Sequence, residues 1–389
     1  MILWCPVCES RLYDAVLEFE NVPIFQLLNV DEHATPEYFA PLDIVRCQAC
    51  GHLYNRAYSE ELGKRMYRGE VLSNVPVNFS MTRNLESIAD WIGHNQFAGR
   101  AVVEVGAGSG HLARILAREA KSVMVFEPSI GLRPEMFPEE NIDLINRDFS
   151  AAAVSSRADL IVCRQVLEHL ADPLTFLREV GHVLRGDGRL YLEVPRAEYI
   201  EDHAALFDFH YAHVQYFHES NLLRLIAKAE FMVERSWLLK EGHDVGMLLR
   251  PHRGVDMRPV AALNSGRLAA DLEHRHAEGR ELLTSLPGDV VLYGATWHGV
   301  AFLNAYQLER QFAVAFDDNV DYAGYALYSS AQKIPVSEPD IGLLLSVNTV
   351  VITAYLHDRV IATKLRDIGF RGRIVSTRAC GTQWSAFLP

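Results

Sequence analysis

The feature that most constrains the fold is the run Ala101-Val-Val-Glu-Val-Gly-Ala-Gly-Ser-Gly-His-Leu-Ala, in which a short apolar segment enters a glycine-rich turn. Glycines occupy alternate positions at Gly106, Gly108 and Gly110. Glycine adopts positive φ without strain and lets a ligand approach the backbone closely. The residues that follow, 111–120, have the composition of a helix. The run therefore predicts the strand, turn and helix of a nucleotide-binding α/β unit.

A second apolar segment, 123–126, ends in Glu127. An acid at the tip of the second strand of such a unit is placed to accept hydrogen bonds from a ribose diol. The glycine spacing is G-x-G-x-G, whereas dinucleotide-binding proteins carry G-x-G-x-x-G. A purely structural turn and an NAD site are the two alternatives that this pattern leaves open.

Several landmarks in register resemble the class I S-adenosylmethionine-dependent methyltransferases. Glu104 and the three glycines match the first motif, E/D-x-G-x-G-x-G, and 158–173 resembles a fourth strand followed by an E-H-x-x-D-P turn that contains Glu168 and His169. The resemblance covers 100–200 and implies an α/β fold with a class I methyltransferase (Rossmann-like) central domain built on a doubly wound parallel sheet. It also implies S-adenosyl-L-methionine as cofactor, bound by Glu104, Gly106, Ala107, Gly108, Gly110, Glu127, Pro128, Asp148, Phe149, Arg164 and Val166.

Four of the six cysteines form two C-x-x-C pairs, Cys5 with Cys8 and Cys47 with Cys50. Each pair places two thiolates on one tight turn, so that two pairs complete a tetrahedral shell of four sulfurs. Such a closed shell has a structural role, and the pattern predicts a zinc-binding module over 1–62. A redox dithiol and chance spacing are the alternatives.

The C-terminal third of the chain repeats the strand and glycine-turn pattern. The run Asp289-Val-Val-Leu-Tyr-Gly-Ala-Thr-Trp-His-Gly predicts another strand, turn and helix, and 312–316 predicts a strand that ends in Asp317 and Asp318. A long polar helix over 263–286 would connect this unit to the first. The turn at Gly294 either binds a second nucleotide or belongs to a Rossmann-like scaffold without a cofactor.

The whole arrangement resembles the zinc-containing deoxysugar C-methyltransferase family, whose members methylate a ring carbon next to a ketone on a nucleotide-linked sugar. The resemblance implies a zinc-binding module over 1–62, a methyltransferase domain over 63–250 and a Rossmann-like substrate-binding domain over 251–389. O- or N-methylation of a natural-product intermediate is the alternative within the enzyme class. A non-catalytic binding protein on the same scaffold is the alternative outside it.

The segment 207–218, FDFHYAHVQYFH, aligns with a histidine-rich stretch of that family, Y-H-E-H-x-x-Y-F. His213 falls on the histidine proposed there as the general base, whereas Ala212 occupies the place of the glutamate. A neutral imidazole can remove a proton beside a carbonyl, and neighbouring hydroxyls can stabilise the enolate. A metal site or structural histidines are the alternatives. The candidate catalytic residues are Tyr67, His169, His210, Tyr211, His213 and Tyr216.

The net charge of −13 over 389 residues argues against a nucleic-acid or anionic-membrane partner. No apolar run reaches the roughly 20 residues that a membrane span needs. The N-terminus, MILWCPVC, has neither the basic region nor the cleavage pattern of a signal peptide. We therefore expect a cytoplasmic monomer or homodimer that acts on a small-molecule substrate, with a nucleotide-linked substrate as one possibility.

Overall fold

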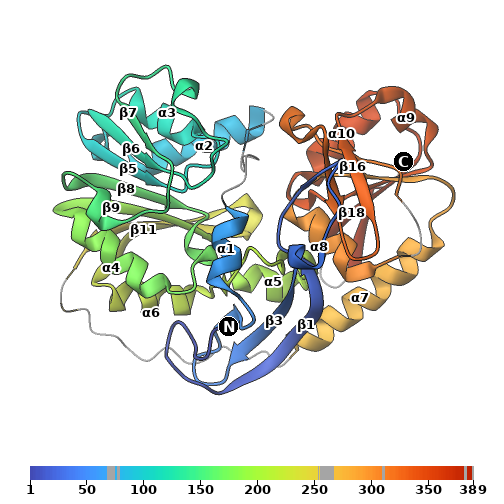
Figure 1. Cartoon of the computed structure of the whole chain (residues 1–389), viewed down its shortest axis with the longest axis horizontal. Helices are drawn as coiled ribbons and strands as arrows, with labels where there is room; N and C mark the ends of the chain where they lie inside the picture. Colours follow the sequence, from blue (N-terminus) through green and yellow to red (C-terminus); the bar gives the residue numbers. More distant parts are fainter. Residues whose placement is uncertain are drawn as a thin grey trace.

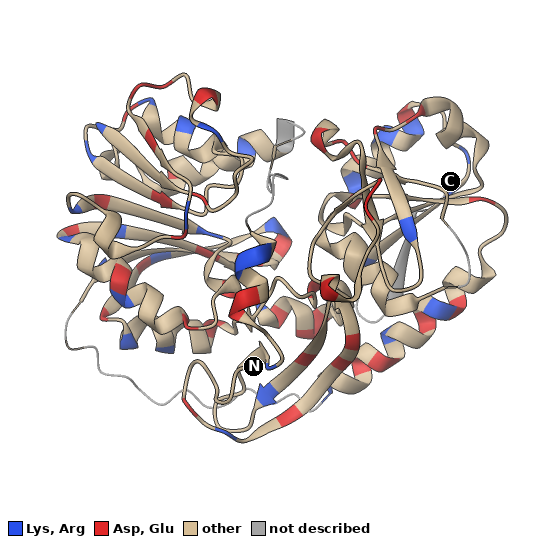
Figure 2. Ribbon diagram, in the orientation of Figure 1, with Lys and Arg blue, Asp and Glu red and all other residues tan. Residues whose placement is uncertain are grey.

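The computed structural model of the chain describes residues 1–67, 75–76, 79–252, 254, 267–308, 312–380 and 383–387. Two α/β lobes lie side by side, and the N-terminal strands run beneath and between them (Figure 1). Acidic and basic side chains are interspersed over both lobes in the described part of the chain (Figure 2). None of the helices found in the described ranges combines the length and the apolar character needed to cross a bilayer.

A seven-stranded sheet with the order β11-β12-β9-β8-β5-β6-β7 forms the first lobe. Its strands are β5 (Ala101–Val105), β6 (Ser122–Phe126), β7 (Ile142–Ile145), β8 (Ala158–Arg164), β9 (Leu184–Pro195), β11 (Phe231–Leu239) and β12 (Asp244–Pro251). The five neighbouring strands β7, β6, β5, β8 and β9 are parallel to one another. Strand β12 is antiparallel to β9, and β11 is antiparallel to β12. Strand order reverses between β5 and β8, which is where open α/β sheets bind ligands at their carboxyl ends.

Helices cover both faces of this sheet. They are α2 (Phe79–Ile92), α3 (His111–Ala117), α4 (Pro173–Val183) and α6 (Glu219–Lys228), with the short α5 (Ala197–His203) after β9. On one face Ile88 of α2 and Leu116 of α3 share a core with Val123, and on the other Leu177 of α4 packs with Leu190. Leu85, Ile88 and Ile92 of α2 recur at helical spacing and are buried, so α2 is an amphipathic helix with its apolar face on the core. The helix after the glycine turn ends earlier than expected because the chain leaves it to form a bridge at residue 120.

The second lobe contains an eight-stranded sheet with the order β19-β18-β17-β13-β14-β16-β15-β2. Its strands are β13 (Val290–Tyr293), β14 (Ala315–Phe316), β15 (Tyr325–Tyr328), β16 (Lys333–Ser337), β17 (Thr349–Ile352), β18 (Arg373–Cys380), β19 (Gln383–Phe387) and β2 (Leu28–Asn29). Its helices are α7 (Leu268–Ser285), α8 (Trp297–Tyr306), α9 (Ile341–Ser346) and α10 (Asp358–Asp367). Helix α7 lies within the polar helix predicted over 263–286, of which residues 263–266 are outside the described ranges.

The N-terminal residues share sheets with both lobes. Strands β1 (Tyr13–Pro23), β3 (Phe39–Cys47) and β4 (Leu53–Asn55) form a sheet whose last member is β10 (Gln215–Tyr216), and helix α1 (Glu60–Met66) follows β4. The intervening β2 pairs with β15 at the edge of the C-terminal sheet. Leu42 of β3, Phe207 and Phe302 of α8 belong to one continuous core. The predicted boundaries 1–62, 63–250 and 251–389 stay a prediction, and across them the three parts of the chain are joined by strand pairing and a common core.

Candidate active site

A cavity of about 840 Å³ lies between the two lobes. One end is formed by the carboxyl ends of β5 and β6, the middle by the histidine-rich segment and the residues that follow α1, and the other end by the turn after β13. The residues of the three parts that matter below are Gly106, Gly108, Glu127, Asp148, Tyr67, His169, His210, His213, Gly294 and Asp317. The cavity therefore brings together the two glycine turns and the histidine cluster that the sequence places far apart.

The first glycine turn is held by Glu127. Gly106 and Gly108 have φ values of 70° and 56°, and a Cβ on Gly106 would lie 2.3 Å from Cγ2 of Val166. Oε2 of Glu127 accepts a hydrogen bond from the Gly108 N–H at 2.7 Å, and Oε1 accepts one from the Ser129 N–H at 3.0 Å. Burial raises the pKa of Glu127. The carboxylate thus fastens the turn and still faces the cavity, where its remaining lone pairs can meet a ribose diol.

Four other predicted donor-site residues line the cavity next to this turn, namely Pro128, Asp148, Phe149 and Val166. The ring of Phe149 packs edge-on against Phe126, with centroids 5.2 Å apart, and both rings line the cavity together with the acids. Acidic acceptors and apolar rings in one cavity suit the ribose and the adenine of S-adenosylmethionine. The residues present therefore fit the predicted cofactor.

The remaining predicted donor-site residues do not line the cavity. Glu104 is buried behind the turn, where burial raises its pKa to about 8 and Arg164 lowers it. Arg164 itself forms an ion pair with Glu193, with Nε 3.1 Å from Oε1. Gly110 has a φ of 74° and begins α3, and Ala107 lies within the turn. These four residues therefore support the glycine turn and do not border the space where the donor would lie.

Three histidine rings form a cluster in the middle of the cavity. The centroid of His213 lies 4.1 Å from that of His210 and 5.1 Å from that of His169. Nδ1 of His169 is 2.7 Å from the carbonyl oxygen of Ala212, which places the proton on Nδ1 and leaves Nε2 as an acceptor. Burial lowers the pKa of His169 to about 4 and holds the pKa values of His210 and His213 well below the usual range. At neutral pH all three rings are uncharged, so each can accept a proton.

The predicted tyrosines divide into two groups. Tyr67 lines the cavity, donates to the carbonyl oxygen of Ala212 at 3.4 Å and packs edge-on against His169. Tyr211 and Tyr216 point elsewhere. The Tyr211 hydroxyl accepts from the Ser59 N–H at 3.1 Å, and the Tyr216 hydroxyl donates to the carbonyl oxygen of His213 at 3.2 Å, so both brace the segment that carries the histidines. Tyr58, which no sequence pattern distinguishes, also lines the cavity.

Glu168 lies beside the histidine cluster without a hydrogen-bond partner. Its side chain is 1% exposed, and neither carboxyl oxygen bonds to any described residue. Oε1 is 3.9 Å from Nε2 of His169, and the ligand atoms of Glu168, His169 and His213 all lie within 4.8 Å of one another. Burial raises the pKa of Glu168 to about 8. The sequence places Glu168 in a recognisable motif, but only the fold brings it next to His213.

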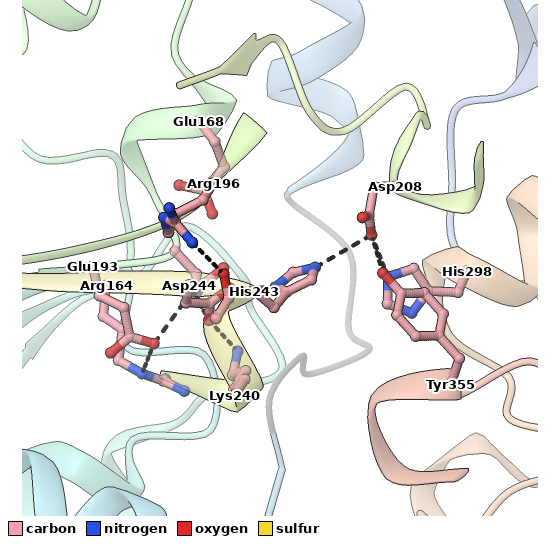
Figure 3. A network of polar contacts seen from close by, with 12 residues as sticks. Arg164, Glu168, Glu193, Arg196, Asp208, Lys240, His243, Asp244, His298 and Tyr355 are labelled. Carbon is pink, nitrogen blue, oxygen red and sulfur yellow. Dashed lines mark hydrogen bonds and ion pairs between the residues drawn. The ribbon is translucent and has the colours of Figure 1, made fainter. Parts of the chain in front are cut away.

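A second polar network, which the sequence does not predict, joins the two lobes (Figure 3). Oδ1 of Asp208 is 2.7 Å from the Tyr355 hydroxyl, 3.1 Å from Nε2 of His298 and 3.4 Å from Nε2 of His243. The other ring nitrogen of His243 contacts Asp244. Burial opposes a charge on His243, but the two carboxylates outweigh it and raise the pKa of His243 to about 9. His243 is therefore an imidazolium that links Asp244 of the first lobe to Asp208. Asp208 in turn contacts His298 and Tyr355 of the second lobe.

The C-terminal turn repeats the hydrogen bonds of the first. Gly294 has a φ of 118°, and a Cβ there would lie 2.5 Å from the nitrogen of Ala354. Oδ2 of Asp317 accepts from the Ala295 N–H at 2.7 Å, and Oδ1 accepts from the Asn319 N–H at 2.9 Å. Glu127 holds its turn in the same way, from the same position at the end of the second strand. The two glycine turns are thus held by the same pattern of hydrogen bonds, and nucleotide binding at the C-terminal turn stays a prediction.

The four paired cysteines converge at one point. Sγ of Cys5 is 3.6 Å from Sγ of Cys50, and Sγ of Cys8 is 3.5 Å from Sγ of Cys47. All four sulfurs lie within 4.8 Å of one another. A tetrahedral shell with Zn–S bonds of about 2.3 Å has edges of roughly 3.8 Å. The spacing fits a zinc ion, and zinc binding stays a prediction.

Residues 79–236 match the family model described as a methyltransferase domain. Together with the sheet order and the glycine turn of this region, the match decides its class. These residues form a class I S-adenosylmethionine-dependent methyltransferase domain. The predicted α/β fold and the predicted methyltransferase class are thereby confirmed. The family of deoxysugar C-methyltransferases and the acceptor stay predictions.

Curated proteins similar to this chain include the ubiquinone biosynthesis O-methyltransferase of Methylococcus capsulatus, which is 28% identical over 105 residues, or 25% of this chain and 44% of the relative. The protein of the same name from Aeromonas salmonicida is 23% identical over 186 residues, 44% of this chain and 74% of that protein. The chain thus covers less than half of the first relative. A solved methyltransferase from Clostridium acetobutylicum is 12% identical with a TM-score of 0.36, covering 43% of this chain and 90% of that one.

Proposed function

We propose that this methyltransferase transfers the methyl group of S-adenosylmethionine to a carbon next to a ketone of a nucleotide-linked deoxysugar or similar intermediate, with His213 as the general base. The observation that carries the proposal is the single cavity that reaches from the first glycine turn, past His213, to the turn at Gly294. We further propose that the protein works in the cytoplasm as a monomer or homodimer. Its net charge of −13 supports a small-molecule substrate over a nucleic acid or membrane.

The donor end would hold the adenosyl group. Glu127 is placed for the ribose, Asp148 for the adenine amine and Phe149 for the adenine face. When bound, the donor supplies an electrophilic methyl group on a sulfonium. The glycine turn would then set the direction from which the acceptor must approach, because methyl transfer needs donor and acceptor in line at roughly 3–3.5 Å.

The opposite end supports a nucleotide-linked acceptor. Asp317 holds the turn at Gly294 as Glu127 holds the first turn, which supports a nucleotide there, and the ring of Trp297 stacks on His210 with centroids 5.0 Å apart. A sugar whose nucleotide occupied this turn would place its ring among the histidines. A free aromatic acceptor would leave that end of the cavity without a ligand.

The histidine cluster supports proton removal from carbon. His213 is buried and uncharged at neutral pH, so it can accept the proton next to the ketone. Tyr67 lies close enough to the cluster to donate to the developing enolate oxygen. Removing water from this region strengthens each of these interactions.

The test uses a nucleotide-linked 4-keto-deoxysugar, S-adenosylhomocysteine and deuterated water. We expect the wild type to exchange the hydrogen next to the ketone for deuterium, and His213→Gln to lose at least 100-fold of that rate, in the range typical of general-base residues. Isothermal titration should show S-adenosylhomocysteine affinity unchanged in His213→Gln. Exchange that persists in the variant would refute the assignment of His213.

Transfer to oxygen is the second candidate, and two observations favour it. Ala212 stands where a carboxylate would raise the basicity of His213, and a hydroxyl acceptor needs a weaker base than a carbon. The two curated relatives named above are called O-methyltransferases. A methyl-labelled product whose label resides on oxygen, with no exchange at carbon, would establish this candidate instead.

A further inference from the structure

Glu168 is a buried carboxyl group that the proposed reaction does not yet use. Both of its oxygens lack a hydrogen-bond partner within the described ranges, although the side chain is 1% exposed. A buried polar group without a partner costs free energy, so such a group in a native protein calls for an explanation. An interaction made only during the reaction is one such explanation.

The backbone fixes Glu168 next to His213. Its carbonyl oxygen accepts a hydrogen bond from the Val214 N–H at 2.8 Å, which ties the turn Leu167–His169 to the segment that carries His213. One carboxyl oxygen of Glu168 lies within 4.8 Å of a ring nitrogen of His213. Because a main-chain bond one residue away holds the two segments together, this proximity belongs to the fold rather than to one flexible side-chain conformation.

The position of Glu168 answers the absence of a carboxylate at Ala212. The side chain of Ala212 is a methyl group with no exposed surface, so it can neither orient the imidazole of His213 nor balance a charge on it. We propose that Glu168 is the positioning carboxylate of His213, and that it stabilises the imidazolium that forms when His213 takes a proton from the acceptor. This inference rests on the proposed function.

The acceptor C–H bond breaks, its proton bonds to His213, and its electron pair forms the new bond to the methyl carbon. The bond between methyl carbon and sulfur breaks with its pair left on sulfur, which loses its positive charge. The proton on His213 then passes to solvent after product leaves. With Glu168 ionised, the pair of side chains goes from one negative charge to none, which is far less costly in a buried site than creating a lone positive charge.

A metal ion shared by Glu168, His169 and His213 fits the distances less well. Two ligand atoms of a tetrahedral ion with bonds of about 2.0 Å are roughly 3.3 Å apart. Oε1 of Glu168 and Nε2 of His169 are 3.9 Å apart. Electrostatic stabilisation has no such geometric requirement and acts at this separation.

Several charged or titratable groups face Glu168. Burial is the largest cause of its pKa of about 8; its own backbone N–H lowers the pKa, Asp244 and Glu193 raise it, and Lys240 lowers it. The other neighbours among the titratable groups are Tyr67, Cys163, His169 and His213. Because these groups leave Glu168 protonated at pH 6 and ionised above pH 9, its effect on His213 should switch on between those values.

The experiment compares the full-length wild type with Glu168→Gln, which keeps the shape and removes the charge, and with the exposed control Glu140→Gln. The readout is the rate of exchange at the acceptor carbon against pH. At an effective dielectric of about 20, a negative charge about 5 Å away raises a proton affinity by roughly two pH units. We therefore expect the wild-type rate to rise through a midpoint near pH 8, on the order of tenfold, and Glu168→Gln to lack this rise while its acceptor KM stays the same.

A second measurement does not need the acceptor. In the protein labelled with ¹³C histidine and saturated with S-adenosylhomocysteine, the ring signal of His213 should show an inflection near pH 8 that is absent in Glu168→Gln and present in Glu140→Gln. Glu168→Asp, which restores the charge, should restore the inflection. An identical His213 titration in wild type and Glu168→Gln would overturn the inference, as would a metal content above one ion per chain that falls by one in Glu168→Gln. If S-adenosylhomocysteine does not bind at all, the proposed function fails instead.

Discussion

The imidazolium of His243 should make the protein less stable as pH rises, which is opposite to the effect of a carboxylate whose pKa is lowered by an ion pair. Its pKa is raised to about 9 from 6.5 because Asp244 and Asp208 outweigh the effect of burial. A histidine with a raised folded-state pKa contributes stability that is complete below its unfolded pKa and is lost as pH rises through the folded pKa. The window therefore runs from about pH 6.5 to pH 9.

The magnitude follows from the difference between the two pKa values. A difference of about 2.5 pH units at 1.36 kcal/mol each is worth about 3 kcal/mol of unfolding free energy. His243→Gln keeps a donor but loses the charge, and it leaves two buried carboxylates without their common cation. Removing one partner of a buried ion pair typically costs about 3–5 kcal/mol.

The assay is urea unfolding followed by tryptophan fluorescence at pH 6, pH 7.5 and pH 9.5. We expect His243→Gln to be less stable than the wild type by about 3 kcal/mol or more at pH 6 and by much less at pH 9.5. The control is His274→Gln on α7, whose side chain is 60% exposed and which should leave the pH dependence unchanged. A stability difference between wild type and His243→Gln that is constant from pH 6 to pH 9.5 would refute the assignment of an imidazolium at this position.

Two further predictions concern the glycine turn of the first lobe and the cysteine cluster. Gly106→Ala should weaken S-adenosylhomocysteine binding by at least tenfold in isothermal titration. The reason is that a Cβ there would lie 2.3 Å from Val166 and that the residue has a positive φ. An unchanged affinity would contradict the role of this turn. Cys47→Ser should lower the zinc content measured by mass spectrometry below one ion per chain and should lower Tm by several degrees. The control Cys163→Ala, which removes a buried thiol outside the cluster, should retain the metal. Full zinc content in Cys47→Ser would count against a site of four sulfurs.

The local elements of the fold can be predicted from short stretches of sequence. The strand and glycine turn before Gly110, the acid at Glu127 and the amphipathic spacing of α2 are each set by neighbours within one or two turns of chain, and all are observed. The convergence of Cys5, Cys8, Cys47 and Cys50 also followed from their spacing, because two tight turns can present four sulfurs to one point. Periodicity and turn chemistry are local properties, which is why a sequence reveals them.

Which of these elements come into contact depends on the three-dimensional packing of the whole chain. No local pattern places Glu168 beside His213 or links His243 to Asp208 and Tyr355, since each contact joins segments that approach through sheet order and a shared core. The same holds for β2, which leaves the N-terminal strands to pair with β15, and for the tyrosines, where Tyr67 faces the cavity and Tyr211 faces away. Side-chain direction within a loop depends on what packs around it, and that information lies in residues far away along the chain.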